Sequence, residues 1–208
     1  MYVPAAFRVG RPDGLTLIAA QPLAQLVVVV DGAPACTPVP MIVRGDSLVG
    51  HLARPNQVWR HAGPALAIFG GPDAYVSPRW YENKPVDGKV VPTWNYTTVQ
   101  VTGQLVAHDD PEWTRQVVVD LTEHFESRFD APWAVTDAPP DYVDTMLRGI
   151  VGIELTDMRI SGKAKLSQNR SSIDQRTVAA GLATGSSVEC ALAEAMGTIP
   201  SADAPTVD

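Results

Sequence analysis

Residues 63–81 read GPALAIFGGPDAYVSPRWY, and residues 91–104 read VPTWNYTTVQVTGQ. In the first segment a Gly-Gly-Pro break at 70–72 separates two mostly apolar runs, a pattern typical of a strand, a turn and a second strand. In the second segment Val99 and Val101 alternate with polar residues, which is the period of a half-buried antiparallel strand. The two segments therefore predict a centre of antiparallel strands around which the rest of the chain packs.

Aromatic and hydrogen-bonding side chains collect where these predicted strands end. They are Ser77, Trp80, Tyr81, Thr93, Trp94, Asn95 and Tyr96. Such a set suits a wall against a flat ligand with polar edges, because aromatic faces stack while hydroxyls and amides form hydrogen bonds. It equally suits an aromatic core at the end of a barrel. The composition of the stretch leaves both interpretations open.

Length and charge bound the class of protein. The 208 residues carry a net charge of −7, with 16 Lys and Arg against 23 Asp and Glu. This length suits a single domain with a full core, which we place at residues 1–197, followed by a disordered tail at residues 198–208. The acidic balance disfavours broad, non-specific nucleic-acid binding, because phosphate neutralisation needs clustered cations.

The sequence also carries signals of location. No apolar run reaches the length of a membrane span, and the N-terminus lacks the layout of a secretory signal. Cys36 and Cys190 stand far apart in different contexts, so a disulfide framework is not expected. These features predict a protein of the reducing cytoplasm.

The remaining strands and helices are predicted from the spacing of apolar residues and from the turn and cap residues between them. Strands are predicted at 25–30, 35–43, 47–52, 65–69, 73–76, 90–104 and 150–161. Helices are predicted at 14–20, 53–61, 111–128, 141–148, 173–183 and 186–197. Because the helices decorate the strands rather than alternate with them, a closed or nearly closed antiparallel barrel is favoured over a doubly wound α/β fold.

Several local signals support these boundaries. The pairs Asp31-Gly32 and Gly45-Asp46 are typical of hairpin turns. Helix caps are predicted at Asp13, at Asp110 before a proline, and at Ser186 with an acidic residue three positions later. Tyr142 and Met146 share one face of their helix, and residues 162–172 read as a polar basic loop.

Two segments could carry binding chemistry. The loop KAKLSQNR at 163–170 supplies cations together with hydroxyl and amide donors, which is the composition of an anion-binding loop. Its polar members are Lys163, Lys165, Ser167, Gln168, Asn169 and Arg170. GHLARPN at 50–56 places His51, Arg54 and Asn56 directly after a strand. A solvated basic loop and a surface turn, respectively, explain the same residues without a ligand.

Most familiar catalytic motifs are absent from the sequence. The four histidines show no metal-ligand spacing, and no HExxH, CxxC or EF-hand pattern occurs, so no metal site is predicted. There is no GxSxG elbow, no GxGxxG and no Walker A loop. A phosphate-bearing cofactor would therefore be held by side chains rather than by a glycine-rich helix start.

Read together, several segments resemble one family across residues 1–197. MYVP, GHLARPN, AIFGGPDAYVSPRWY, VPTWNY, DAPP, IVGIEL and GKAKLSQNR occur in the order of the PaiB-like family. The resemblance implies a mainly β fold with peripheral helices (α+β), namely a six-stranded antiparallel Greek-key split β-barrel of the FMN-binding type. That family is similar to the pyridoxamine-phosphate oxidase superfamily.

The resemblance also implies a cofactor, a partner and an activity. Such proteins are homodimers with FMN at the dimer interface, and the name-bearing members are described as negative transcriptional regulators. By position, His51 and Arg54 fall near the flavin phosphate or ribityl chain. The residues that fall toward the flavin ring are Ser77, Trp80, Tyr81, Thr93, Trp94 and Asn95. The residues expected from the partner subunit are Lys165, Ser167, Gln168 and Arg170.

The chain departs from the family pattern at three positions. Ala6 and Pro38 replace histidines, and Gln57 replaces a proline. The loss of two histidines puts His-dependent chemistry in doubt. Three hypotheses follow: an FMN-binding regulator with or without direct DNA contact, an NAD(P)H-linked FMN-dependent oxidoreductase, or a split barrel that binds no flavin. No side chain stands out as a catalytic acid or base.

Overall fold

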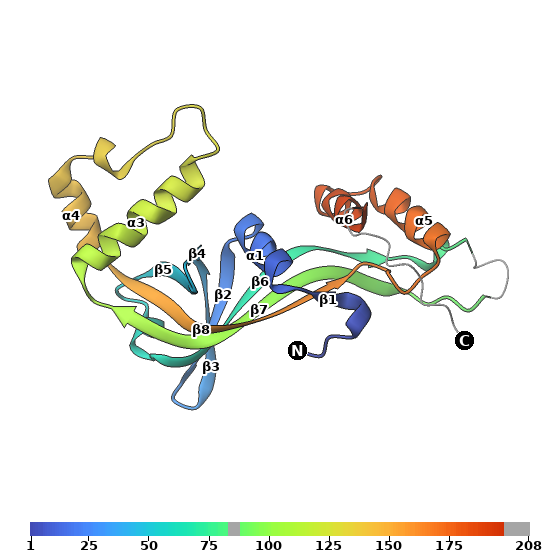
Figure 1. The fold of residues 1–208 in the computed structure, drawn as a ribbon, viewed down its shortest axis with the longest axis horizontal. Helices are drawn as coiled ribbons and strands as arrows, with labels where there is room; N and C mark the ends of the chain where they lie inside the picture. The colour runs from blue at the N-terminus through green and yellow to red at the C-terminus, as the bar shows by residue number, and fades with distance from the viewer. Residues whose placement is uncertain (83–87, 198–208) are drawn as a thin grey trace. The chain divides into compact units, whose positions relative to one another are not determined.

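The computed structural model describes residues 1–82 and 88–197, in which β-strands predominate (Figure 1). The strands are β1 (Arg8–Val9), β2 (Leu23–Val30), β3 (Ala33–Pro40), β4 (Ile42–Arg44), β5 (Ser47–Ala53), β6 (Gly63–Val76), β7 (Thr93–His108) and β8 (Ile150–Lys165). The α-helices are α1 (Arg11–Ala20), α3 (Pro111–Glu126), α4 (Pro140–Arg148), α5 (Ser172–Leu182) and α6 (Ser187–Gly197). Short 3-10 helices are η1 (Ala5–Phe7), η2 (Gln57–Arg60), η3 (Pro78–Trp80) and η4 (Val135–Asp137).

All eight strands belong to one sheet. Its order is β3-β2-β6-β7-β8-β5-β4, and β1 pairs with β8 off this path. The β2–β3, β2–β6, β4–β5, β5–β8 and β1–β8 pairs are antiparallel. This confirms the predicted mainly β fold with peripheral helices, although the sheet has eight strands where six were expected.

The chain divides into two compact units. Among the described residues, one comprises 1–11, 70–82, 88–99 and 161–197, and the other comprises 12–69 and 100–160. The three long strands β6, β7 and β8 each supply residues to both units. No helix of the described residues is long and apolar enough to span a bilayer.

The unit of residues 12–69 and 100–160 is built from local hairpins and a covering helix. The β2–β3 turn contains Asp31 at φ 48° and Gly32 at φ 81°, as the Asp-Gly pair predicted. Helix α3 buries Val117 and Leu121 in one cluster with residues of β4 and β5. Its first turn is capped by Asp110, whose Oδ1 accepts from two backbone N–H groups at 2.9 and 3.3 Å, which confirms the predicted cap.

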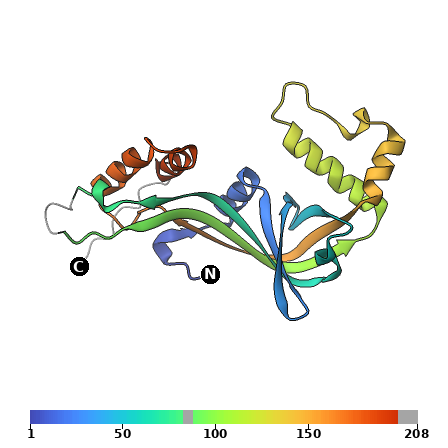
Figure 2. The ribbon, with the colours of Figure 1, turned by 180° about the vertical axis from the view of Figure 1, so that it is seen from behind.

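The other unit pairs two helices with the distal parts of the long strands. Leu182 of α5 and Leu192 of α6 are buried in one cluster with Val76 and Leu166, so the helices cover one sheet face (Figures 1 and 2). The predicted capping box of α6 is present: the Ser186 backbone N–H donates to Glu189 Oε2 at 2.7 Å.

Two predicted breaks in the strands are wrong. The turn at 70–72 does not form, because β6 runs unbroken through it and keeps the alternation of buried and exposed side chains on either side. The loop at 162–172 begins too early, since residues up to Lys165 belong to β8 and Lys163 pairs with Arg8 of β1. In both places the sheet outweighs the local turn or loop composition.

Two helix predictions also need correction. Only η2 forms in the segment 53–61, where Pro55 lacks the N–H that a helix needs. Helix α1 starts at Arg11, so Asp13 lies in its first turn rather than at its cap. Tyr142 and Met146 share one face of α4, as predicted; this face is exposed, and the helix buries Val143 and Leu147 on the neighbouring face. The predicted tail at residues 198–208 and positions 83–87, between the predicted strands at 73–76 and 90–104, lie outside the described residues.

Helix α5 approaches η3 closely through a glycine. A Cβ added at Gly181 would lie 2.6 Å from ring atoms of Trp80, closer than van der Waals contact allows. We predict that Gly181→Ala lowers the free energy of unfolding by about 1–3 kcal/mol, because the indole must move out of its packed position. Urea denaturation checks this, with Gly70→Ala as the control, since a Cβ there meets no atom within 4 Å. Equal stability of the two variants would contradict the packing.

Candidate functional site

Strand β7 separates two kinds of side chain by its alternation. Asn95 and Thr97 are buried on one face of the strand, and on this face Asn95 Nδ2 lies 3.7 Å from Met196 Sδ of α6. Trp94, Tyr96 and Thr98 alternate with them and point to the opposite face. Because β6 and β8 alternate in the same way, this unit has one covered sheet face and one open face.

The open face carries aromatic rings beside lysines. Its members, here called the aromatic–cationic face, are Tyr75, Trp94, Tyr96, Lys163 and Lys165. Trp94 is 51% and Tyr75 is 47% exposed, and their ring centroids lie 6.3 Å apart in an edge-on arrangement. The Nζ atom of Lys163 lies 5.4 Å from the centroid of Tyr96. The face therefore offers ring surfaces and positive charge together.

Lys165 is held in place by strand β7. Its Nζ donates to the carbonyl oxygen of Trp94 at 2.7 Å and to Thr93 Oγ1. Burial lowers the pKa of Lys165, the nearby charges of Lys163 and Arg170 lower it further, and Tyr96 acts in the opposite direction. An anion placed beside this ammonium group would oppose the depression of its pKa.

On the covered side, a buried polar contact joins β7 to the turn after β8. Asn95 is 0% exposed, and its Nδ2 donates to Ser167 Oγ at 2.9 Å. Ser167 is buried and holds φ at 66°, a left-handed conformation that is uncommon for residues other than glycine. Asn95 Oδ1, Thr97 Oγ1 and the Tyr81 hydroxyl are buried without a hydrogen-bond partner among the described residues. Unpartnered buried oxygens need an explanation, such as an ordered water or a ligand.

The other predicted residues of this unit support the turn and η3. Gln168 closes the turn by accepting from the Leu166 N–H and donating to the Ala164 carbonyl. The Arg170 guanidinium carbon lies 4.8 Å from the Tyr81 ring centroid. Ser77 Oγ accepts from the Arg79 N–H and so caps η3.

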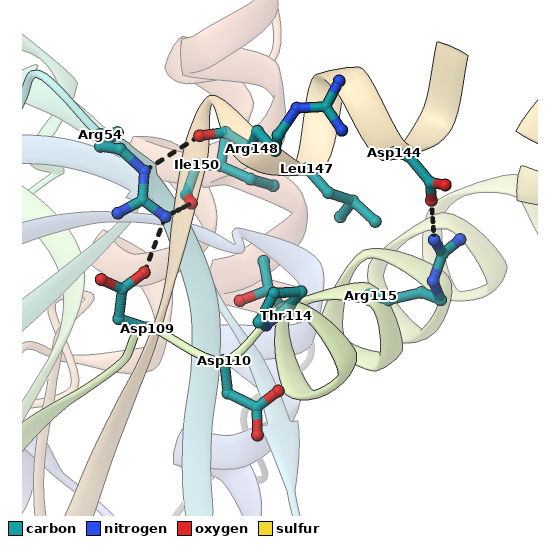
Figure 3. A pocket seen from close by; sticks show the side chains of 10 residues that line it. Arg54, Asp109, Asp110, Thr114, Arg115, Asp144, Leu147, Arg148 and Ile150 are labelled. Atoms are coloured by element: carbon teal, nitrogen blue, oxygen red, sulfur yellow. Dashed lines mark hydrogen bonds and ion pairs between the residues drawn. The ribbon is translucent and has the colours of Figure 1, made fainter. Parts of the chain in front are cut away.

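Arg54 lies in the other unit, at a pocket of about 520 Å³ between the start of α3 and the end of α4 (Figure 3). Its guanidinium donates to Asp109 Oδ1 at 2.7 Å and to the carbonyl oxygens of Arg148 and Ile150 at 3.0 and 3.1 Å. The hydrogen bond that Arg54 donates to Asp109 raises the pKa of Arg54 and lowers the pKa of Asp109. This arginine therefore joins two strand ends to the loop before α3.

His51 belongs to the same unit as Arg54 but lines a different pocket, together with residues of α3. Burial lowers the pKa of its imidazole, so the ring is neutral at pH 7.

The predicted residues thus separate into groups. Thr93, Trp94 and Lys165 meet within one chain, because the Lys165 Nζ donates to Thr93 Oγ1 and to the Trp94 carbonyl oxygen. A second group lies on the covered side or in the adjoining turn: Ser77, Trp80, Tyr81, Asn95, Ser167, Gln168 and Arg170. Tyr75 was missed as a site residue, although its place two residues before Ser77 in an alternating strand could have indicated it.

One family model matches residues 1–158, and its description is "Putative FMN-binding domain". The Bacillus subtilis "Protease synthase and sporulation protein PAI 2" is 30% identical over 186 residues, which cover 86% of this chain and 87% of that protein. Two fungal proteins, from Emericella nidulans and Aspergillus fumigatus, match at 37% and 35% identity, and the chain spans only 59% and 51% of their lengths.

Two solved structures share the fold. The conserved hypothetical protein Rv2991 from Mycobacterium tuberculosis superposes with a TM-score of 0.58 at 15% identity, covering 79% of this chain and 91% of that one. The FAD and heme binding protein from Mycobacterium smegmatis superposes with a TM-score of 0.54 at 19% identity, covering 75% and 71%. These likenesses confirm the predicted split-barrel fold.

Proposed function

We propose, because this chain belongs to the FMN-binding domain family whose model covers residues 1–158, that it acts as a flavin-linked negative regulator of transcription. FMN is its cofactor, and PAI 2 of Bacillus subtilis is a member of the same family along nearly the whole chain. The observation that carries the regulatory role is this similarity to PAI 2, which spans 87% of a protein named for protease synthesis and sporulation.

The aromatic–cationic face is the place where we propose that FMN is held. FMN has a phosphate, which calls for cations, and a flat ring, which calls for aromatic contact. Among the described residues, no carboxylate forms an ion pair with Lys163 or Lys165, so their charge is available to an anion. Trp94 and Tyr75 supply exposed ring surface beside these lysines. The residues present therefore fit the cofactor.

The buried polar residues behind this face also suit a polar-edged ligand. Asn95 fixes the position of Ser167, and the Ser167 turn in its left-handed conformation brings Arg170 into the electrostatic reach of Lys165. The chain's own residues would thus bind the phosphate, orient the ring and keep water from one side of it. When bound, FMN supplies hydride and single-electron transfer.

Regulation through direct DNA contact has a clear test. With a net charge of −7, the chain is expected to bind promoter DNA only through a local cationic surface. A regulator that contacts DNA should shift its own promoter fragment at sub-micromolar protein, more strongly at low salt, and with a dependence on added FMN. No shift at low salt, with or without FMN, would contradict direct DNA contact.

The exposure of Trp94 and Tyr75 favours a second candidate, an FMN-dependent oxidoreductase, because an open ring surface admits a second reactant. The test is anaerobic addition of NADH or NADPH to the FMN-loaded protein. Bleaching of the flavin band near about 450 nm, followed by turnover with an electron acceptor, would support it. A bound flavin that neither nucleotide reduces would contradict it.

The predicted homodimer remains part of the proposal. An exposed aromatic surface of this kind is typical of association sites, and a second subunit would shield it from water. Sedimentation of the FMN-loaded protein should give twice the mass of the chain, and a monomer at micromolar concentration would contradict the proposed dimer.

The pH dependence of FMN affinity should report on Lys165. An anion favours the protonated ammonium, so affinity is complete below the lowered pKa of Lys165 in the free protein and falls as the pH rises through it. We expect the affinity to fall at a lower pH than an ordinary lysine would give, and we expect Lys165→Arg to remove this fall, because arginine stays protonated across the alkaline range. Fluorescence titrations across this range check it. An identical fall in the arginine variant would assign the proton to another group.

A further inference from the structure

A carboxylate lies beside the rings of the aromatic–cationic face. The indole N–H of Trp94 in β7 donates to Asp73 Oδ1 in β6 at 2.7 Å, which is at the short end of the range for N–H···O hydrogen bonds. Asp73 and Tyr75 are exposed and lie two positions apart in β6, so both side chains point to the open face. Asp73 is therefore joined directly to Trp94, the most exposed ring of this face.

The hydrogen bond to Asp73 fixes the orientation of the Trp94 indole. An exposed side chain changes rotamer within nanoseconds when nothing holds it. Here the N–H edge of the indole is bound to β6, while the backbone carbonyl of Trp94 accepts from the Lys165 Nζ of β8 at 2.7 Å. The Tyr75 ring packs against the indole at an interplanar angle of 63°. Contacts from both neighbouring strands thus hold a half-exposed ring in one orientation, as a preorganised binding surface requires.

The carboxylate also changes the electron density of the indole. A hydrogen bond donated to an anion is charge-assisted, and it draws the N–H proton toward the acceptor, which leaves more negative charge on the ring. An electron-rich ring stacks more favourably on an electron-poor ring than on another electron-rich one. Oxidised isoalloxazine is electron-poor, whereas the reduced ring has gained two electrons. The charge of Asp73 acts in the same direction as the stacking, because a carboxylate repels the anionic form of reduced flavin.

We propose that Asp73 is a positioning residue, which holds the Trp94 indole as one wall for the flavin ring and makes the site favour oxidised over reduced FMN. This inference rests on the proposed flavin site on the aromatic–cationic face. Asp73 was not among the predicted binding residues, and its charge is opposite to the charge that binds a phosphate. It acts on the flavin through Trp94, while Lys163 and Lys165 lie on β8, on the other side of β7.

The first test needs no flavin. In the free protein, Asp73→Leu removes the acceptor, so the Trp94 indole N–H proton resonance should move upfield and exchange faster with solvent. Asp73→Asn keeps an acceptor oxygen without the charge and should give an intermediate position. The control Asp130→Leu makes the same change at an exposed aspartate of the other unit and should leave the resonance in place. A resonance that Asp73→Leu does not move would overturn the positioning role.

The second test compares two forms of the cofactor by anaerobic calorimetry, with FMN oxidised or reduced by dithionite. The unaltered chain should bind oxidised FMN more tightly than reduced FMN. Asp73→Leu should weaken binding of oxidised FMN about two- to tenfold, the range of one aromatic contact, and should not weaken binding of reduced FMN. Asp73→Asn should restore part of the affinity for oxidised FMN, because it still orients the indole.

Two outcomes separate this inference from the flavin site on which it rests. A merely structural role of Asp73 would lower both affinities by the same factor, and this result would overturn the preference for oxidised FMN while leaving the flavin site in place. An unaltered chain that binds neither form would contradict the flavin site and this inference together. An oxidised-to-reduced affinity ratio that changes in Asp73→Leu and stays constant in Asp130→Leu is the result that we expect.

Discussion

The double variant Lys165→Ala, Arg170→Ala should weaken FMN binding by about 3–6 kcal/mol, because in the proposed site one cation on the aromatic–cationic face and one in the adjoining turn would each make a charge-assisted contact worth about 1.5–3 kcal/mol. This corresponds to a rise in Kd of about two to four orders of magnitude. The side chains of Lys165 and Arg170 lie within electrostatic reach of each other, since the charge of Arg170 lowers the pKa of Lys165 in the free protein. Quenching of FMN fluorescence on addition of increasing protein measures the dissociation constants of the unaltered chain and of the double variant.

Two further variants separate charge from structure. Lys165→Gln keeps a donor for the Trp94 carbonyl and loses only the charge, so it should show about half of the loss in binding free energy. Arg128→Ala removes an exposed cation from the other unit and should bind FMN as the unaltered chain does. Unchanged affinity in the double variant would place the phosphate elsewhere, with Arg54 as the next candidate.

Asn95→Asp should destabilise the unit formed by α5, α6 and the distal strands by about 3–5 kcal/mol at neutral pH. The side chain is fully buried, and its described contacts are Ser167 Oγ and Met196 Sδ, neither of which can neutralise a carboxylate. Burial raises the pKa of an acid at this position in the folded chain, so the deficit should be small in acid and grow as the pH rises. Urea denaturation at neutral and acidic pH checks both statements.

The matched control is Asn169→Asp, which makes the same chemical change at an exposed position of the same turn. Its effect should stay within about 0.5 kcal/mol. If Asn95→Asp were equally mild, the Asn95–Ser167 contact would not be the structural link described above.

Local signals predicted the elements that depend on neighbours in sequence. Asp110 and the Ser186–Glu189 pair cap their helices as expected, because a cap is formed between residues two or three positions apart. The Asp31-Gly32 turn is likewise specified by the backbone preferences of two residues. Such features need no knowledge of what packs on them.

The errors arose where strand pairing decides the outcome. Gly70, Gly71 and Pro72 are turn residues by composition, yet β6 passes through them. By composition Lys163 belongs to a basic loop. In the structure it pairs with Arg8 of β1, more than a hundred and fifty positions earlier in the sequence. Propensity could not anticipate these pairings, because the sheet partners are distant in sequence.

The site residues show the same division. The resemblance gathered twelve positions, but it could not say which face of a strand each occupies. Alternation along β7 places Trp94 on the open face and Asn95 on the covered one, so one is available to contact a ligand and the other to hold the turn. His51 and Arg54 come from one short motif, yet they line different pockets, because His51 lies within β5 whereas Arg54 lies beyond its end and donates to the carbonyls of Arg148 and Ile150.

The most direct measurement is the absorption spectrum of the purified protein before and after incubation with FMN and removal of unbound flavin. We predict a retained flavin band that is lost in the double variant Lys165→Ala, Arg170→Ala and kept in Arg128→Ala. A colourless protein that retains no FMN, although it is folded by circular dichroism, would contradict the flavin site on the aromatic–cationic face and the function built on it.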